Sequence, residues 1–242
     1  MCQAGGRGPY PRAATMGADA LKNARGKGEK MKKIPTLFKR VFEGHRIKEV
    51  LPEVTPGMEW VLEGKGRATI KYDGSCVGWY KGKWYKRYDA KNGKKPPEGA
   101  IPCCEPDPVT GHWPHWVQID MINTKPEDKW FVHAILEWLH SLPYDRDAMT
   151  KIDPPDFFLT YEAVGPHFQG NPYDLRDDTL FRHGEIMPVV YGEDVERSFE
   201  GMRKWLEEHN EEGLVFWLDG EPRCKIKRTD FGLEWPVKGE KE

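Results

Sequence analysis

Three lysines occupy positions from which they could act together on a phosphate group. Lys71 lies between a short apolar segment (residues 68–70) and an Asp73-Gly74 turn, so we expect it at the end of a strand. Lys225 and Lys227 are two residues apart on a predicted strand and therefore face the same side. A lysine amine can attack phosphorus, and two further cations can hold the phosphate oxygens. This pattern makes Lys71 the candidate nucleophile.

The charge state of Lys71 decides whether it can act as a nucleophile. Four cations are close to it in the sequence, namely Lys65, Arg67, Lys86 and Arg87. Partial burial at the mouth of a sheet and repulsion from these cations both favour the neutral amine. We therefore predict a neutral Lys71 surrounded by cations. The alternative is a solvated lysine in an ordinary hairpin turn, because Lys-x-Asp-Gly is a weak pattern by itself.

Two glutamates supply the carboxylates that such a reaction needs. Glu162 lies near the end of a predicted strand (residues 157–164), and Glu212 begins another. Carboxylates bind divalent metal ions or ribose hydroxyls, and Mg²⁺ prefers carboxylate oxygen to thiolate sulfur. Structural interpretations remain open for all of these groups. Glu162 could form a salt bridge, Glu212 could be one of several acids after a helix, and the lysine pair could lie on an exposed edge strand.

The net charge of −2 conceals an uneven distribution. Residues 1–33 carry eight Lys and Arg against two acids, so the remainder of the chain is acidic. An acidic body argues against a protein that coats nucleic acid through bulk positive charge. Within that body, however, residues 64–95 hold ten Lys and Arg against two Asp. A cationic region of this size suits recognition of phosphate at one site.

Five irregularly spaced cysteines in 242 residues indicate a reducing compartment, and we expect a cytoplasmic protein. The sequence has no apolar run long enough to span a bilayer, and no apolar segment follows the basic N-terminal residues. We therefore expect neither membrane insertion nor a secretory signal. Cys103, Cys104, His112 and His115 form an alternative, zinc-binding set, although they lack the Cys-x-x-Cys spacing of common zinc sites.

The pattern of apolar residues predicts an α+β fold with mixed or antiparallel sheets and few helices, because strands and helices do not alternate regularly. Residues 1–33 are predicted to be a disordered basic extension, and residues 34–242 to form one domain. We expect helices at 127–142 and 193–209, strands at 59–62, 68–72, 157–164 and 180–190, and hairpins at 76–88 and 213–227. Residues 37–51 are expected to add a strand or a helical turn, 91–108 to form a loop, and 113–119 a buried aromatic corner.

The order of these motifs resembles that of a known family. Lys71-Tyr72-Asp73-Gly74, the Tyr-Glu-Ala-Val-Gly segment around Glu162, Glu212-Gly213-Leu214-Val215 and Lys225-Ile226-Lys227 are similar to nucleotidyltransferase motifs I, III, IV and V of the polynucleotide ligases and mRNA capping enzymes. Residues 169–173 and the segment from Gly232 to Pro236 extend the resemblance to the single-domain ATP-dependent 5′-3′ RNA ligases known from vertebrates and their relatives. It covers residues 35–236.

The resemblance implies a fold, an activity and a set of ligands. The fold is an ATP-grasp-like nucleotidyltransferase domain over residues 34–242, with no OB-fold appended. The activity is ATP-dependent joining of RNA 5′-phosphate and 3′-hydroxyl ends through lysyl-AMP and RNA-adenylate, with Mg²⁺ or Mn²⁺ and without an obligate protein partner. Three alternatives remain: transfer of AMP to a non-RNA acceptor, ligation of DNA strands, and a non-catalytic RNA-binding module.

The resemblance also implies which residues contact the adenosine. Ile70 would offer backbone groups to the adenine edge, and Phe181 would stack on the base, a role for which His183 competes. Glu162 would bind the ribose hydroxyls. The chain departs from phage-type RNA ligases at Cys76, where those enzymes commonly carry an arginine.

The remaining implied roles concern the phosphates and the metal ion. Lys71 would form lysyl-AMP, and Arg87 would contact the ribose or phosphate. Lys225 and Lys227 would hold the α-phosphate and steady the departing pyrophosphate, and Glu212 would bind the metal ion or its water shell.

Overall fold

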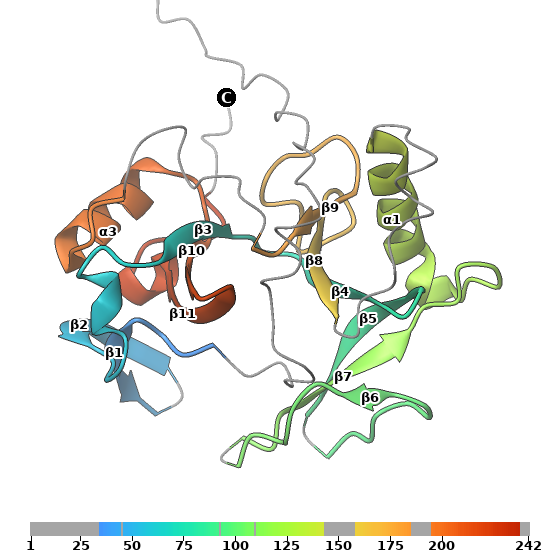
Figure 1. Ribbon diagram of the computed structural model, residues 1–242, viewed down its shortest axis with the longest axis horizontal. Helices are drawn as coiled ribbons and strands as arrows, with labels where there is room; N and C mark the ends of the chain where they lie inside the picture. The colour runs from blue at the N-terminus through green and yellow to red at the C-terminus, as the bar shows by residue number, and fades with distance from the viewer. Residues whose placement is uncertain are drawn as a thin grey trace, which may run out of the picture.

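The computed structural model describes residues 34–44, 46–91, 93–108, 110–142, 158–184 and 195–237. Within these ranges the chain forms eleven β-strands and two α-helices, arranged as a three-stranded sheet, a six-stranded sheet and a separate hairpin (Figure 1). Every ladder between these strands is antiparallel. The predicted α+β class is therefore confirmed. The predicted extension at 1–33 lies outside the described residues.

The three-stranded sheet carries the candidate lysines. Its order is β11-β10-β3, with β3 at Arg67–Lys71, β10 at Gly213–Leu218 and β11 at Glu221–Lys227. Successive residues of a strand face opposite sides. Leu214, Phe216 and Ile226 therefore share the face that packs on helix α3 (Phe199–Glu208), where all three are fully buried. Lys71 and Lys227, both opposite Gly213, lie on the other face.

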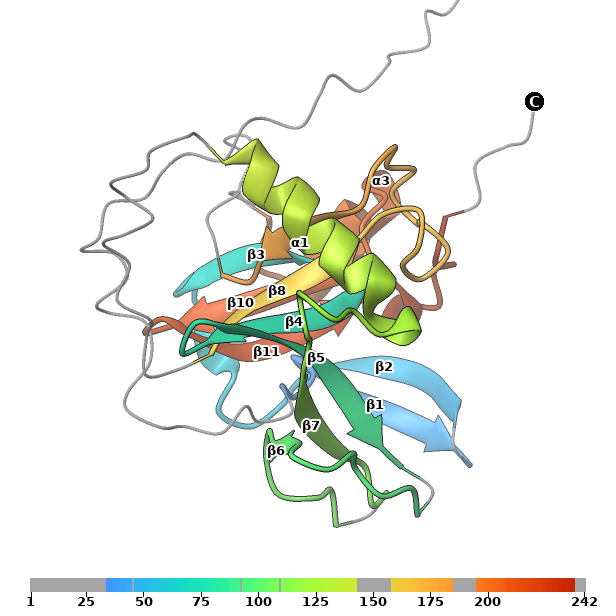
Figure 2. The same cartoon turned by 90° about the vertical axis from the view of Figure 1, so that its right-hand side faces the viewer.

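The six-stranded sheet has the order β6-β7-β5-β4-β8-β9. Its strands are β4 (Ser75–Tyr80), β5 (Lys83–Ala90), β6 (Ile101–Pro102), β7 (Trp113–Gln118), β8 (Leu159–Val164) and β9 (Thr179–Arg182). Helix α1 (Lys129–Ser141), which follows a 3₁₀ turn η2 (Pro126–Asp128), covers one face and lies across β4 and β8 (Figure 2). Val77, Tyr161 and Ala163 are buried in that core. The opposite face of the same strands carries Cys76, Glu162 and Phe181.

The hairpin of β1 (Phe38–Glu43) and β2 (Arg46–Val54) is attached to the three-stranded sheet by the residues that precede it. The Lys225 N–H donates to the Pro35 carbonyl at 3.0 Å, and the Leu37 N–H donates to the Lys225 carbonyl at 2.8 Å. Leu37 and Phe38 are fully buried in the core beneath that sheet. Of the two structures expected at residues 37–51, the strand is the one that forms.

The turn of Tyr72, Asp73 and Gly74 carries the chain from β3 in one sheet to β4 in the other (Figure 1). Only glycine fits at its last position. A Cβ on Gly74 would lie 2.2 Å from the Ala163 carbonyl oxygen and 2.9 Å from the Glu162 Cγ. The predicted strand–turn–strand arrangement around Lys71 is therefore confirmed, and the turn lies directly against β8.

Two predicted elements are wrong, and the loop expected at 91–108 contains the two-residue strand β6, which pairs with β7. Residues 59–62 begin a 3₁₀ turn, η1 (Glu59–Val61), because one turn is enough to bury Val61 while Glu59 stays exposed. The expected aromatic corner at 113–119 is the regular strand β7, in which Trp116 pairs with Arg87, because β5 and β6 flank it on both sides.

The helix expected at 193–209 is described from residue 199, after an N-cap in which the Ser198 hydroxyl accepts from the Gly201 N–H. Residues 185–190 of the expected strand at 180–190 lie outside the described residues, as do 193–194 of the helix. After β11 the chain forms a final 3₁₀ turn, η3 (Arg228–Phe231). In the described part of the chain, no helix combines the length and apolar character needed to cross a membrane.

Candidate active site

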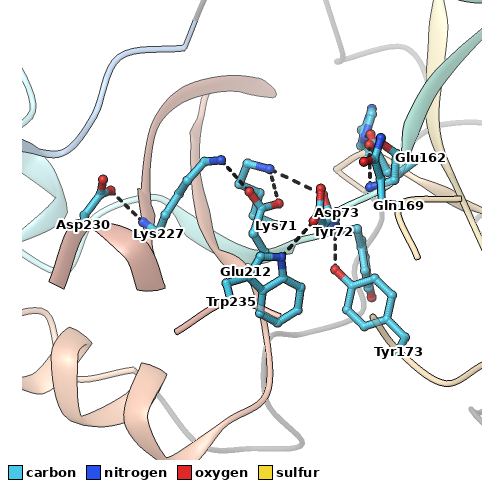
Figure 3. Close-up of polar contacts among 12 residues, drawn as sticks. Lys71, Tyr72, Asp73, Glu162, Gln169, Tyr173, Glu212, Lys227, Asp230 and Trp235 are labelled. Atoms are coloured by element: carbon cyan, nitrogen blue, oxygen red, sulfur yellow. Dashed lines mark hydrogen bonds and ion pairs between the residues drawn. The ribbon is translucent and has the colours of Figure 1, made fainter. Parts of the chain in front are cut away.

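Glu212 holds two of the three candidate lysines. Its side chain is 4% exposed, and both of its carboxylate oxygens are engaged. The Lys71 Nζ forms an ion pair with Oε2, and the Lys227 Nζ lies 2.5 Å from Oε1 (Figure 3). Lys71 therefore does not point to solvent, and it shares one carboxylate with Lys227.

Strand register explains why these side chains meet. Gly213 of β10 pairs with Lys71 on one side and with Lys227 on the other. A Cβ on Gly213 would lie 2.1 Å from the Ile226 carbonyl oxygen, so the glycine permits close approach of β11. Glu212, one residue before β10, can then reach the lysine at the end of each neighbouring strand.

Lys225 is the third cation of this cluster. The pKa of Lys225 is lowered from 10.5 to about 8, chiefly by burial and then by the charges of Lys71, Lys227 and Arg40, whereas Glu212 acts in the opposite direction. Three lysines around a single carboxylate leave an excess of positive charge. That excess suits a bound anion, which would relieve the repulsion among the lysines.

A hollow of about 340 Å³ opens beside this cluster. Lys225 and Arg40 line it, together with residues 34–36 and Thr55. Arg40 also forms an ion pair with the buried Asp230, whose other oxygen accepts from the Lys227 N–H at 2.8 Å. The β1–β2 hairpin therefore contributes to the same cationic region as the lysine pair.

Glu162 lies on the other side of the connecting turn, in the six-stranded sheet. Its Oε1 accepts from the Gly74 N–H at 3.1 Å, and its Oε2 lies 2.9 Å from the His183 Nε2. The His183 Nδ1 lies 3.0 Å from the Thr160 hydroxyl. These contacts fix the orientation of the carboxylate and connect it to the residue that ends the turn after Lys71.

A row of side chains crosses the six-stranded sheet at Glu162. Glu162 pairs with Cys76 on β4 and with Phe181 on β9, and the pairing of Val77 with Lys86 brings Arg87 beside Cys76. Burial and the negative charge of Glu162 raise the pKa of the Cys76 thiol, whereas Arg87 opposes this shift. Arg87 itself forms an ion pair with Asp89, with 3.2 Å between Nε and Oδ1.

Three further residues hold the turn, and none of them was predicted to have a role. The Asp73 N–H donates to the Tyr173 hydroxyl at 2.6 Å, the Trp235 Nε1 donates to the Asp73 Oδ2 at 2.8 Å, and the Gln169 Nε2 donates to the Gly74 carbonyl at 3.3 Å (Figure 3). All three occur in segments that carried the family resemblance. That resemblance was therefore the only signal that could have drawn attention to them.

The expected ring of cations around Lys71 is wrong. Lys65 pairs with Glu63, Lys86 pairs with Asp128, and Arg67 donates to the Gly184 carbonyl at 2.7 Å. Residues close in sequence to Lys71 thus find partners elsewhere, and its charged neighbours are Glu212, one residue before β10, and the lysines of β11. Lys71 is held in an ion pair with Glu212 and not in the purely cationic surroundings that favoured a neutral amine.

The zinc set proposed from Cys103, Cys104, His112 and His115 does not form. Among the described residues, one group of three side chains brings metal-ligating atoms within 4.8 Å of one another, and it consists of Cys76, Glu162 and His183. The His115 Nδ1 lies 2.9 Å from the Trp113 carbonyl, and His112 lies near Asp89. The spacing of the four residues in the sequence therefore did not reflect their arrangement in space.

The residues expected to contact adenine have other partners. Phe181 lies 4.5 Å from the Tyr72 ring, centroid to centroid, with a tilt of 34° between the planes. Both ring nitrogens of its competitor, His183, are within hydrogen-bond distance of Thr160 or Glu162. Ile70 lies on β3 and pairs with Leu214 of β10. Strand β3 is an edge strand of its sheet. One edge of that strand therefore remains outside the sheet ladder.

No family model matches this chain, and a search of curated proteins finds no significant match. The site is therefore interpreted from its own geometry. It combines the Lys71 amine, two more lysines on the same face, a buried carboxylate in contact with two of the three, and a second carboxylate across a short turn. Such a set suits attack on a phosphate ester and stabilisation of the charge that develops on its oxygens.

Proposed function

We propose that this protein is an ATP-dependent RNA ligase with a nucleotidyltransferase domain, and that Lys71 carries AMP as a covalent intermediate. The observation that supports it best is the convergence of Lys71, Lys225 and Lys227 around Glu212. The three lysines come from two strands far apart in the sequence, and their excess positive charge is suited to a polyphosphate.

In the first step of the proposed reaction, the Lys71 Nζ bonds to the α-phosphorus of ATP while the bond to the bridging oxygen breaks and pyrophosphate leaves. Lys71 must lose a proton to attack, and the Glu212 carboxylate in contact with Nζ can accept it. Lys225 and Lys227 would offset the charge on the phosphate oxygens. The hollow lined by Arg40 and Lys225 would hold the departing phosphates.

A divalent metal ion fits the donor set of this site only with a rearrangement. Glu212 is the carboxylate nearest Lys71, and carboxylate oxygen is the ligand that Mg²⁺ or Mn²⁺ prefers, but both of its oxygens are already bound by lysines. Binding of the ion would require one lysine to release its oxygen. When bound, the ion would supply Lewis-acid stabilisation of phosphate charge.

The adenosine would lie toward the six-stranded sheet. Glu162, held by the Gly74 N–H and His183, would accept from the ribose hydroxyls, and the edge of β3 at Ile70 would face the base. Phe181 would stack on the adenine after separating from Tyr72, and Arg87 would contact the ribose or phosphate. The two later steps would transfer AMP to an RNA 5′-phosphate and then release it as a 3′-hydroxyl attacks.

Intact-protein mass spectrometry tests the first step. The full chain is incubated with Mg²⁺ and each nucleoside triphosphate in turn, and we expect a mass increase of one AMP with ATP. Lys71→Ala should abolish the adduct. Lys65→Ala is the matched control, because Lys65 lies nearby in sequence but pairs with Glu63. An adduct of full yield on Lys71→Ala would refute the assignment of the nucleophile.

A gel assay tests the acceptor. RNA with a 5′-phosphate is supplied with or without a partner carrying a 3′-hydroxyl, and a matched DNA pair is run beside it. We expect longer product with RNA only. If the protein is adenylylated but never lengthens RNA, transfer of AMP to another acceptor is the correct function. If only DNA is lengthened, the protein is a DNA-strand ligase.

A further inference from the structure

The row of side chains on the six-stranded sheet contains a second cluster, formed by a thiol, a carboxylate and an imidazole. The Cys76 sulfur, a Glu162 oxygen and a His183 ring nitrogen all lie within 4.8 Å of one another. None of these atoms belongs to the lysine cluster around Glu212. In the proposed transfer of AMP, Cys76 has no assigned role and His183 only orients Glu162.

The backbone brings the three side chains to one place. Cys76 and Glu162 are directly paired across β4 and β8, and Glu162 is directly paired with Phe181 on β9. His183 is two residues after Phe181 and so lies on the same face. Its N–H donates to the Thr160 carbonyl at 2.9 Å, which holds it close to β8. His183 follows the last residue of β9, and this hydrogen bond extends the pairing with β8 by one residue.

The donor atoms fit one class of metal ion. Thiolate sulfur and imidazole nitrogen favour Zn²⁺ and disfavour Mg²⁺. In tetrahedral Zn²⁺ sites, neighbouring ligand atoms are about 3.4 to 3.6 Å apart. The Glu162 Oε2 and His183 Nε2 are 2.9 Å apart, so admitting the ion requires them to separate by only a few tenths of an ångström. Three protein ligands leave the fourth position to water.

The surroundings can orient the imidazole of His183 as a ligand. The Thr160 hydroxyl is 3.0 Å from the His183 Nδ1, and its oxygen can accept from an N–H there while Nε2 turns its lone pair to the ion. The side chains of His183 and Glu162 are 29% and 14% exposed, so an ion can reach them from solvent. The charge of the nearby Arg87 is offset by Asp89.

We propose that Cys76, Glu162 and His183 form an inhibitory site for Zn²⁺. On binding, the S–H bond of Cys76 breaks, its proton passes to solvent, and a Zn–S bond forms, with no change in oxidation state. The ion takes the Oε2 of Glu162, which the proposed function uses for the ribose. This inhibitory effect rests on the proposed function, whereas the binding of the ion does not.

Cobalt binding tests the site without reference to ATP. Co²⁺ is added to the metal-free full chain, and we expect the near-ultraviolet absorption band of a Co²⁺–thiolate bond, which Zn²⁺ then displaces. Loss of an outer hydrogen-bond partner weakens metal sites by about 10- to 100-fold, so loss of a ligand in Cys76→Ser or His183→Gln should weaken Zn²⁺ binding by at least about 100-fold. Cys224→Ser, a buried thiol in the other core, is the control and should keep the band.

Adenylylation measured with and without Zn²⁺ tests the inhibition. Zn²⁺ at a concentration far below that of Mg²⁺ should reduce the AMP adduct of the wild-type chain by at least about tenfold. The ratio of the two yields should return to near one in Cys76→Ser.

A cobalt band that persists in both Cys76→Ser and His183→Gln overturns the metal site. Inhibition that is equal in Cys76→Ser and the wild type overturns the inhibitory role, and failure to form any adduct refutes the proposed function alone.

Discussion

The two sheets approach the Lys71 turn with opposite kinds of chemistry. The three-stranded sheet contributes three lysines and one carboxylate that is saturated by two of them. The six-stranded sheet contributes a carboxylate that is held by a backbone N–H and an imidazole, with a thiol beside it. The lysines of the three-stranded sheet concentrate positive charge. In the six-stranded sheet, hydrogen bonds fix the orientation of the Glu162 carboxylate. A site between them is suited to a ligand with a phosphate end and a neutral hydroxyl-bearing end.

The largest expected difference between the two sides concerns their carboxylates. Glu212→Gln removes the carboxylate that pairs with both Lys71 and Lys227, and breaking such a buried ion pair should lower the free energy of unfolding by about 3 to 4 kcal/mol. Adduct formation should fall at least about 100-fold. Glu162→Gln should cost about 1 kcal/mol, because an amide oxygen can still accept from the Gly74 N–H. Urea denaturation and intact mass measure both effects, and equal losses of stability would contradict the comparison.

The glycines of the two sides offer the second test. Gly74→Ala and Gly213→Ala each place a methyl group about 2 Å from a carbonyl oxygen of the neighbouring strand. We expect each change to lower the free energy of unfolding by about 2 to 3 kcal/mol. Ser75→Ala, which adds no atom, is the control. If Gly74→Ala unfolded at the wild-type urea midpoint, the close packing of the turn against β8 would be wrong.

The anchors of the turn should have a smaller effect. Tyr173→Phe leaves the Asp73 N–H without the phenolic oxygen that accepts from it, and should cost about 1 to 2 kcal/mol. Trp235→Phe removes the hydrogen bond to the Asp73 carboxylate, which water can replace, and keeps an aromatic ring next to Tyr173. Thermal denaturation of both variants should therefore rank Tyr173→Phe as the less stable. The reverse ranking would indicate that the Asp73 carboxylate, and not its backbone, fixes the turn.

The smallest expected effect is the contribution of Lys225 to the dependence of stability on pH. The pKa of Lys225 is about 8 in the folded protein against 10.5 for an ordinary lysine, chiefly because of burial. Between these values Lys225 binds fewer protons in the folded state than in the unfolded chain, so its contribution to stability rises as pH increases from about 8 to about 10. Below pH 8, Lys225 is protonated in both the folded and the unfolded state, so the full unfavourable free energy of burying its charge is present.

Substitution of Lys225 checks this prediction. Lys225→Met should remove the rise, which we expect to be on the order of 1 kcal/mol, and should gain stability below pH 8. Urea midpoints measured at several pH values for the variant and the wild type provide the comparison. An unchanged slope in Lys225→Met would assign the rise to another group.

The positions of the lysines in the three-stranded sheet were largely predictable from the sequence, because they depend on residues close together in the chain. The spacing of Lys225 and Lys227 already places them on one face, and the Asp73-Gly74 turn already ends the strand of Lys71. The sequence could not reveal that Gly213 lies between Lys71 and Lys227, since that fact depends on the register of strands about 140 residues apart.

The six-stranded side was less predictable because neighbours in sequence diverge in space. Lys86 and Arg87 are adjacent, and both were expected near Lys71. In a strand they face opposite sides, so Lys86 pairs with Asp128 beneath α1 while Arg87 lies beside Cys76. The grouping of Cys76, Glu162 and His183 depends in the same way on the pairing of three strands, and no short motif in the sequence signals it.

The attachment of Pro35 and Leu37 to Lys225 has a practical consequence for work on this protein. These residues precede the first strand and look dispensable, yet their backbone hydrogen bonds flank the strand that presents Lys225 and Lys227. An affinity tag or a protease cleavage site belongs upstream of residue 34. Removing a few residues more would break these hydrogen bonds to β11 and disturb the position of both lysines without changing either side chain.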